Sequence, residues 1–338
     1  MTNSCSPPLP KTFANWQRSF LHRSKRAKPD QKGARAMFKS LLSAPATRCF
    51  STESAQKVQS ALGAGTRYMT PDDIAREYPF YNLQGILGAN HNLIDEGYFD
   101  GNTLFDWWKR KARENGVEYI TNEVVGITKN KVGDRVDSVT LKSGNRISCD
   151  TLVNASGLRA AITARMAGIE IPVEPRKRYT FIFDAENPLD RDLPLTIDPS
   201  GVHTRSDGRF YLAGCPPDED PPVEPDDFEQ DFNIWEDKAW PAIANRIPQF
   251  EAIKLVNSWA GHYAFNVFDQ NAILGPHTEV TNFMFVNGFS GHGFQQSPAM
   301  GRGMAELVIH GEFRTLDLTP FGYDRIAQNK PFIEKAVI

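Results

Sequence analysis

Residues 282–294 read NFMFVNGFSGHGF, and this stretch decides the fold. The run Asn282–Val286 predicts a strand, Gly288–Gly293 a glycine-rich loop, and Pro298–His310 a helix. Three glycines within six residues let the backbone approach a flat or anionic ligand closely. The helix that follows offers free N–H groups and the positive end of its dipole. The pattern therefore favours a ligand-binding loop over a purely structural turn.

A second strand-to-helix turn lies at Asn154–Gly157. It follows a predicted strand at Thr151–Asn154 and precedes a predicted helix at Leu158–Ala167. The small side chains of Ala155 and Ser156 would let the phosphates of a dinucleotide lie against the backbone, although strand-to-helix turns often use small residues for structural reasons. A doubly wound sheet lines up several such turns along one edge, so the two turns together predict a nucleotide-binding fold.

The preceding segment fits the middle of such a fold. It predicts an amphipathic helix closed by Gly116, a strand, and a small antiparallel meander. These elements are Leu104–Asn115, Val117–Ile120, Val124–Lys129, Val136–Leu141 and Arg146–Cys149. Nearer the start, Ser54–Leu62 predicts a helix, and Thr70-Pro71 predicts the N-cap and first position of a helix that ends at Tyr78.

Residues 173–263 predict an α+β unit inserted into the nucleotide fold. Its predicted strands are Tyr179–Phe183, Leu195–Ile197, Val202–Arg205, Phe210–Gly214 and Ala252–Tyr263. Pro216–Pro225 is an acidic, proline-rich loop, and Asp226–Arg246 predicts a long helix.

Candidate substrate residues lie in this unit. His262 and Tyr263 could face a substrate, although a lone histidine at a strand end is more often a structural residue. Arg176-Lys177-Arg178 precedes a predicted strand and is equally compatible with carboxylate binding and with a solvated basic edge. Because the histidines and acids show no HxxE or HExxH spacing, no metal site is predicted.

Composition narrows the function classes. The 338 residues are 40% hydrophobic, and their net charge of −3 argues against nucleic acid as the main partner. No stretch reaches the roughly 20 apolar residues of a transmembrane segment. The four cysteines show no CxxC spacing, which disfavours disulfides and zinc and favours a reducing compartment.

The first 54 residues form a basic tail. Met1 to Thr52 holds ten Lys or Arg and a single acid, Asp30. Such a composition is typical of organelle transit peptides, and Arg48-Cys49-Phe50-Ser51 resembles a mitochondrial processing site. The tail therefore predicts mitochondrial localisation. A disordered basic tail or a misassembled gene start, with a cytoplasmic protein, is the alternative.

Residues from Lys57 to Ile338 resemble the FAD-dependent oxidoreductases of the D-amino-acid oxidase (DAO) type, which include sarcosine oxidase and dimethylglycine dehydrogenase. The resemblance rests on short strings that occur in the family's order. They are LVNASG (152–157), PVEPRKRY (172–179), WAGHY (259–263), DQN (269–271), GPH (275–277) and GFSGHG (288–293), with Gln295 and Gln296 after them.

The resemblance implies an α/β plus α+β fold: a partial doubly wound FAD-binding domain of the glutathione-reductase type, with an inserted, mainly antiparallel substrate domain. The expected division is 1–54 tail, 55–95 substrate-domain segment, 96–172 middle part of the FAD-binding domain, 173–256 substrate domain, and 257–338 C-terminal part of the FAD-binding domain.

The resemblance also implies FAD as cofactor and hydride transfer from a carbon beside an amine nitrogen to flavin N5. The residues expected to bind FAD are Gly288, Phe289, Ser290, Gly291, His292, Gly293, Phe294 and Gln295 at the flavin ring, Asn154, Ala155, Ser156 and Gly157 at the pyrophosphate, and Val124 and Val125 at the adenine. Tyr263, His262 and Arg178 are the candidates for contact with a small amine or amino-acid substrate, and no catalytic base is assigned. A protein or a quinone would accept the electrons.

Two departures from the family matter. The family opens with a strand, a GxGxxG turn and an acid that binds the ribose, and this chain is expected to lack all three. Lys stands at the position of Gln295 in the sarcosine-oxidase branch, so the neutral Gln295 predicts a dehydrogenase rather than an oxidase. Covalent flavin attachment is not expected, because the C-terminal loop holds no flavin-linking cysteine and Cys215 is expected in the proline-rich loop. The alternatives are a non-catalytic assembly factor, since one branch of the family is linked to respiratory complex I assembly, and an inactive truncated form.

Overall fold

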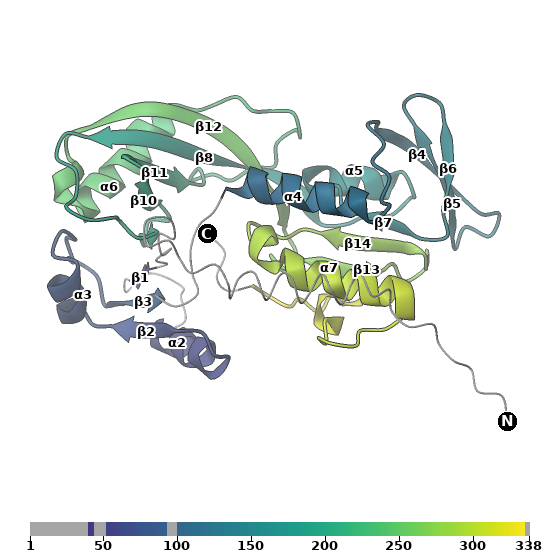
Figure 1. Cartoon of the computed structure of the whole chain (residues 1–338), viewed down its shortest axis with the longest axis horizontal. Helices are drawn as coiled ribbons and strands as arrows, with labels where there is room; N and C mark the ends of the chain where they lie inside the picture. Colours follow the sequence, from purple (N-terminus) through teal and green to yellow (C-terminus); the bar gives the residue numbers. More distant parts are fainter. Residues whose placement is uncertain (1–39, 44–51, 93–99, 335–338) are drawn as a thin grey trace.

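Two long antiparallel strands, β8 (Val173–Ala185) and β12 (Ile253–Asn266), run along one edge of the largest sheet (Figure 1). The computed structural model describes residues 40–43, 52–92 and 100–334. Within them the large sheet has eight strands in the order β12-β8-β11-β10-β9-β1-β3-β2. The other six strands are β1 (Ser40–Ser43), β2 (Thr66–Met69), β3 (Gly88–Asn92), β9 (Thr196–Ile197), β10 (His203–Asp207) and β11 (Phe210–Cys215).

The core of the large sheet is aromatic. Phe183 is fully buried and meets Phe250 edge to face at 5.6 Å between ring centroids, while Phe181 packs on Trp235 at 5.1 Å. Trp235 belongs to a π-helical turn, Trp235–Ala239, that leads into α6 (Trp240–Arg246). Aromatic pairs of this kind stabilise beyond the area they bury.

A second, three-stranded sheet has the order β13-β14-β7 (Figure 1). The strand β14 (Phe283–Asn287) pairs antiparallel with β13 (Ile273–Pro276) and parallel with β7 (Leu152–Asn154). The turn after β7 leads into the 3-10 turn Gly157–Arg159 and α5 (Ala160–Arg165), and the loop after β14 leads into α7 (Gly293–His310). Both turns thus leave the same end of the parallel pair.

The predicted meander is confirmed as a third sheet, β4 (Val124–Lys129), β5 (Val136–Leu141) and β6 (Arg146–Ser148). It is joined to the second sheet through Asn282, whose Oδ1 accepts from Val136 N at 2.7 Å and whose Nδ2 donates to Val136 O at 2.8 Å. Four further helices are α2 (Thr52–Ala61), α3 (Pro71–Glu77), α4 (Gly101–Glu114) and α8 (Asp324–Ala327). The predicted start of α3 is confirmed by a capping box between Thr70 and Asp73.

The long helix predicted over Asp226–Arg246 is wrong in its first third. Helical structure begins only at Asn233, two residues before the π-helical turn. The preceding residues are bound to the large sheet instead: Asp227 accepts from Lys177 Nζ at 2.6 Å, and Gln230 Oε1 accepts from Ser258 Oγ at 2.7 Å. These contacts between distant segments outweigh local helix propensity.

Two other predicted elements differ. Val117–Ile120 is not a strand, because Tyr119 packs back on α4, with Lys109 and Arg113 5.5 and 5.0 Å from its ring centroid. The last long helix begins at Gly293, five residues before the predicted Pro298. Pro298 has no N–H to donate to the carbonyl of Phe294, and the Ser297 hydroxyl donates to that carbonyl at 2.9 Å.

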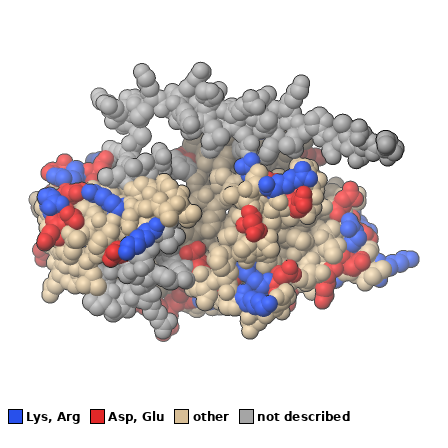
Figure 2. All heavy atoms as spheres, turned by 90° about the horizontal axis from the view of Figure 1, so that it is seen from below, with Lys and Arg blue, Asp and Glu red and all other residues tan. Residues whose placement is uncertain are grey.

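The basic tail falls mostly outside the described residues, including Arg48–Ser51. The strand β1 was not predicted; it pairs antiparallel with β3 and parallel with β9. The fold is mixed α/β with antiparallel sheets. No helix within the described ranges has the length and apolar character needed to cross a membrane. On the face seen in Figure 2, acidic and basic side chains are interspersed over the described part, in keeping with the small net charge.

Candidate active site

The two predicted ligand-binding turns lie side by side because the strands before them are parallel. Phe285 of β14 is in register with Asn154 of β7, and Asn287 Nδ2 donates weakly to Asn154 Oδ1 over 3.4 Å. Asn154 also fixes its own turn: its Oδ1 accepts from Ser156 Oγ at 2.6 Å, and its Nδ2 donates to Ala160 O at 2.9 Å. The structure thus brings Asn154–Gly157 and Gly288–Gly293 to one edge of the small sheet.

The Gly288–Gly293 loop has a backbone shape that needs glycine. Gly288, Ser290 and Gly291 all have positive φ, at 70°, 50° and 98°. A Cβ on Gly291 would lie 2.5 Å from the Tyr263 ring, so the loop and β12 touch where glycine is required. The buried Ser290 joins them further, since its N–H donates to Ala264 O at 3.1 Å and its Oγ accepts from Asn266 N at 2.9 Å.

The start of α7 has the features of an anion- or carbonyl-binding site. His292 is its N-cap and makes no side-chain capping bond to the first turn, whose N–H groups lack intrahelical partners. Near it, Asn287 Oδ1 and Gln296 Oε1 are buried and have no hydrogen-bond partner among the described residues. Buried polar atoms rarely stay unsatisfied, so these two acceptor oxygens point to a bound group that also carries N–H or O–H donors. Gln295 is exposed in the first turn.

The remaining residues that were predicted to bind the cofactor lie outside the Gly288–Gly293 loop. Val124 and Val125 lie in β4 of the separate meander sheet, where Val125 is 48% exposed. Gly157 has φ +57°, and no atom lies within 4 Å of the place where a Cβ would stand, so its surface is open. Phe294 stacks on Trp108 of α4, with ring centroids 6.4 Å apart. The sequence did not single out Trp108, because nothing local connects α4 with the glycine-rich loop.

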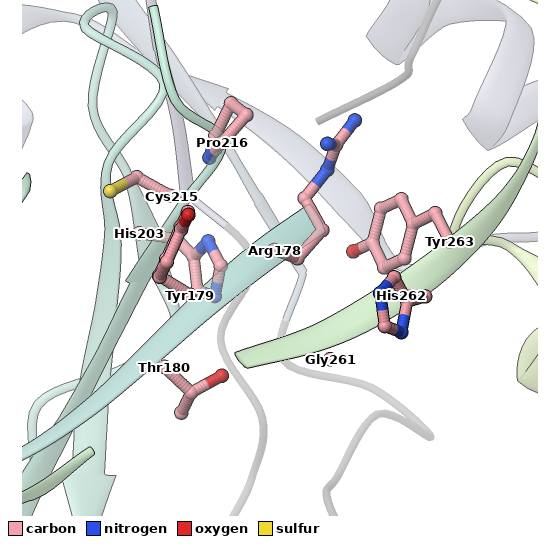
Figure 3. A pocket seen from close by; sticks show the side chains of 9 residues that line it. All are labelled: Arg178, Tyr179, Thr180, His203, Cys215, Pro216, Gly261, His262 and Tyr263. Carbon is pink, nitrogen blue, oxygen red and sulfur yellow. The ribbon is translucent and has the colours of Figure 1, made fainter. Parts of the chain in front are cut away.

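A pocket of about 200 Å³ opens in the large sheet across β8, β10, β11 and β12 (Figure 3). All three predicted substrate residues, Arg178, His262 and Tyr263, line it. The remaining lining residues are Tyr179, Thr180, His203, Cys215, Pro216 and Gly261. Cys215 and His203 were not predicted to line it, since no motif surrounds either.

The sequence suggested that Cys215 lies in the proline-rich loop. This prediction is wrong, because Cys215 is the last residue of β11. Its pairing with Tyr179 of β8 extends the strand by one residue beyond the predicted Gly214. Burial raises the pKa of the Cys215 thiol to about 11, so the thiol is protonated at neutral pH.

Tyr263 connects the pocket with the glycine-rich loop. One side of its ring meets Gly291, and the Arg178 guanidinium lies 4.7 Å from its centroid. Figure 3 shows its hydroxyl directed toward the Arg178 side chain. Burial raises the pKa of Tyr263, which keeps the phenol neutral. A ligand in the pocket and a ring on the loop would therefore share Tyr263 as a wall.

His262 lies inside β12, not at a strand end as predicted, and has a fixed tautomer. Its Nε2 lies 2.8 Å from the carbonyl oxygen of Asp227, and since a carbonyl only accepts, Nε2 carries the proton. Its Nδ1 is buried and without a hydrogen-bond partner within the described ranges. The ring also packs edge to face on Phe228 at 4.6 Å. His262 is thus positioned by backbone and packing together.

The three consecutive cations lie within β8 rather than before a strand, and each is paired. Arg176 binds Glu174 at 2.6 Å, and Lys177 binds Asp227 at 2.6 Å. Arg178 binds Asp220 through two parallel bonds, Nη1 to Oδ1 at 2.9 Å and Nη2 to Oδ2 at 3.0 Å. The hydrogen bond from Lys177 lowers the pKa of Asp227. The alternative that these three cations form a solvated basic edge is therefore wrong, because the side chains of Lys177 and Arg178 are each only 12% exposed.

Comparisons with a family model and with individual relatives point to the same kind of protein. The family described as "FAD dependent oxidoreductase" (DAO) matches residues 32–307. The Xenopus laevis protein "FAD-dependent oxidoreductase domain-containing protein 1" is 36% identical over 310 residues, which are 83% of this chain and 62% of that protein. Human "Sarcosine dehydrogenase, mitochondrial" is 24% identical over 74% of this chain and 28% of its own length. The chain therefore spans less than two thirds of these relatives.

Solved structures share the fold. L-proline dehydrogenase from P. horikoshii superposes with a TM-score of 0.76 at 23% identity, covering 97% of this chain and 88% of that one. Glycine oxidase from Geobacillus kaustophilus superposes with a TM-score of 0.69 at 20% identity, covering 95% and 84%. At these identities the likeness concerns the fold alone.

Proposed function

The chain belongs to the DAO family of FAD-dependent oxidoreductases, and on that premise we propose that the protein oxidises the C–N bond of an amine, N-methyl or α-amino acid. The observation that carries the proposal is the meeting of the pocket and the glycine-rich loop at Tyr263. The relative sarcosine dehydrogenase and the structural neighbours L-proline dehydrogenase and glycine oxidase are named after amino or imino acids, which supports this substrate class.

FAD is the cofactor of this family, and the residues of the small sheet fit parts of it. The loop Gly288–Phe294 and the start of α7 would hold the flavin ring, where Asn287 Oδ1 and Gln296 Oε1 lack partners among the described residues. The open turn Asn154–Gly157 would hold the pyrophosphate. When bound, FAD supplies the hydride acceptor for the reaction. The small sheet with its two turns is accordingly part of a doubly wound FAD-binding domain, and the large sheet is the substrate domain.

The pocket residues have distinct parts in substrate binding. Arg178 presents a planar, permanently charged donor that matches a carboxylate. Tyr263 supplies a neutral aromatic wall between the substrate and the loop, which also excludes water. His262 donates its Nε2 proton to Asp227 O, and this hydrogen bond fixes the tautomer and the orientation of the ring at the edge of the pocket. Beside the ring site, Gln295 adds no charge, which supports a dehydrogenase that passes electrons to a protein or quinone. A mitochondrial location is proposed with it.

The test is flavin uptake followed by reduction. The purified full chain is incubated with FAD, freed of unbound cofactor, and mixed without oxygen with L-proline, N-methylglycine or glycine. We expect bound flavin absorption that bleaches with at least one of them. Gly291→Ala should abolish uptake, because its Cβ collides with Tyr263, while the matched control Gly301→Ala, with open space around it, should not. A chain that stays colourless, or flavin that no amine bleaches, contradicts the proposal.

A further inference from the structure

An acidic, proline-rich segment, residues 216–227, begins at the pocket and contacts its lining residues Arg178 and His262; it is called the strap here. Its sequence PPDEDPPVEPDD contains five prolines, six acids and no cation. Its first residue, Pro216, lines the pocket, as Arg178 does (Figure 3). It follows directly on β11, whose last residue is Cys215.

The strap is attached mainly by ion pairs. Its carboxylates bind cations of three different elements: Asp218 with Lys238 at 2.7 Å, Asp220 and Asp227 with β8, and Asp226 with Arg159 at 2.5 Å. The backbone adds a bond from Val223 N to Pro175 O at 3.0 Å. None of residues 216–224 is buried. The carboxylates of Asp218 and Asp226 are strongly exposed, so their ion pairs are individually weak, and the partly buried pair of Asp220 with Arg178 is the main ionic attachment of residues 216–224. Because none of these residues is buried, this part of the strap can leave the sheet without opening a core once that pair is replaced.

Asp220 differs from the other strap acids because its partner belongs to the pocket. The side chains of Arg178 and Asp220 are 12% and 27% exposed, whereas that of Asp218 is 86% exposed. The two parallel N–H···O bonds are the geometry with which arginine binds the carboxylate of any ligand. Arg178 also keeps its Nε buried without a hydrogen-bond partner in the described part of the chain, so its donors are not exhausted.

Resting on the proposed function of this pocket, we propose that Asp220 is an internal stand-in for the substrate carboxylate. In the resting chain the Asp220 carboxylate neutralises Arg178. A substrate carboxylate replaces it on the same guanidinium, and residues 216–224 move away. The strap thereby sets specificity: a ligand that lacks a carboxylate leaves Arg178 bound to Asp220 and the strap in place. The affinity for carboxylates is lowered by the competition, as for any ligand that must displace a preformed contact.

The test is carboxylate binding to the full chain without FAD, measured by calorimetry. The probes are acetate and L-proline, with pyrrolidine as the probe that lacks a carboxylate. Asp220→Asn removes the competing charge and should lower the dissociation constant of acetate and L-proline by roughly tenfold or more. Asp218→Asn, in the same strap but outside the pocket, should leave it unchanged. Arg178→Met should abolish binding of both carboxylates.

A second measurement follows the strap directly. A glutamate-specific protease must bind an extended segment of its substrate, so we expect it to cleave after Glu219 faster when the strap is released; the bond after Glu224 resists cleavage because Pro225 follows it. Acetate and L-proline should speed this cleavage in the wild type, and pyrrolidine should not. If Asp220→Asn folds, as judged by its circular dichroism, and binds acetate no more tightly than the wild type, or if no probe changes cleavage, the inference is wrong. Both measurements are made without flavin, so their failure is separate from failure of FAD uptake or bleaching.

Discussion

Tyr263 lies between two segments that are held in opposite ways. The turn after β12, which supports the glycine-rich loop, rests on a buried polar network: Asp269 is 2% exposed and binds Arg325 through two bonds of 2.6 and 3.0 Å. In that network Asn266 Nδ2 also donates to Asp269 Oδ1 and to Asn271 O. The strap, on the pocket side, rests on ion pairs of which those of Asp218 and Asp226 have exposed carboxylates and that of Asp220 with Arg178 is only partly buried.

The difference shows which side of the site is rigid. Buried charges and amides with every bond satisfied hold one arrangement, because leaving any of them unpaired is costly. Exposed ion pairs exchange readily with water and with ligands. The proposed cofactor side is thus fixed in advance, while the strap on the proposed substrate side can rearrange, which would suit a site that keeps its cofactor and exchanges its substrate.

Removing Asp269 should have the largest effect. Asp269→Ala leaves the buried Arg325 guanidinium without its carboxylate, and we expect a loss of about 3–5 kcal/mol in the free energy of unfolding. Urea denaturation followed by circular dichroism measures it. Asp269→Asn, which keeps the hydrogen-bonding shape, should lose less. If the free energy of unfolding falls by no more than is expected for a surface ion pair, the two sides of Tyr263 do not differ in rigidity as inferred.

Gly291→Ala should be next. It combines a positive φ of 98° with the collision against Tyr263, and we expect about 2–3 kcal/mol of destabilisation. Gly157→Ala isolates the first factor, because its φ is +57° and its surroundings are open, and should cost about 1 kcal/mol. Gly301→Ala, inside α7 with open space, should stabilise by up to about 1 kcal/mol. Equal effects at Gly291 and Gly157 would show that the loop does not press on Tyr263.

The smallest effect is expected in the strap. Asp218→Asn breaks a pair in which the carboxylate is 86% exposed, so the free energy of unfolding should change by less than about 0.5 kcal/mol. Raising the salt concentration should speed glutamate-specific cleavage of the strap, since screening weakens its exposed pairs. The cleavage rate at low and high salt measures this. A salt-independent rate would mean that packing, not charge, holds the strap.

Local chemistry made several elements predictable. The N-cap of α3 is Thr70 as predicted, and Gly133 and Gly144, both with positive φ, turn the chain between the strands of the predicted meander. The strand β14 and the loop after it also follow from the local pattern of apolar residues and glycines. In each case the deciding contacts join residues close in sequence, so propensity and turn chemistry suffice.

Contacts between distant segments made other features unpredictable. Residues 226–232 fail to form a helix because Lys177 and Ser258 bind this segment to the sheet. The pairing of Asp220 with Arg178 joins residues 42 positions apart, and no sequence pattern announces it. For the same reason the sequence did not predict that Cys215 and His203 line the pocket.

The sequence by itself determined the kind of site: strings such as GFSGHG and VNASG carry the backbone freedom and small side chains that a nucleotide cofactor requires, and these are local properties. It also indicated Arg178, His262 and Tyr263 as substrate candidates. Only the tertiary structure decided that these three line one pocket, that Tyr263 meets Gly291, and that Asp220 neutralises Arg178. Burial, pairing and close approach depend on which distant segments the sheets bring together, and that is fixed only when the whole chain packs.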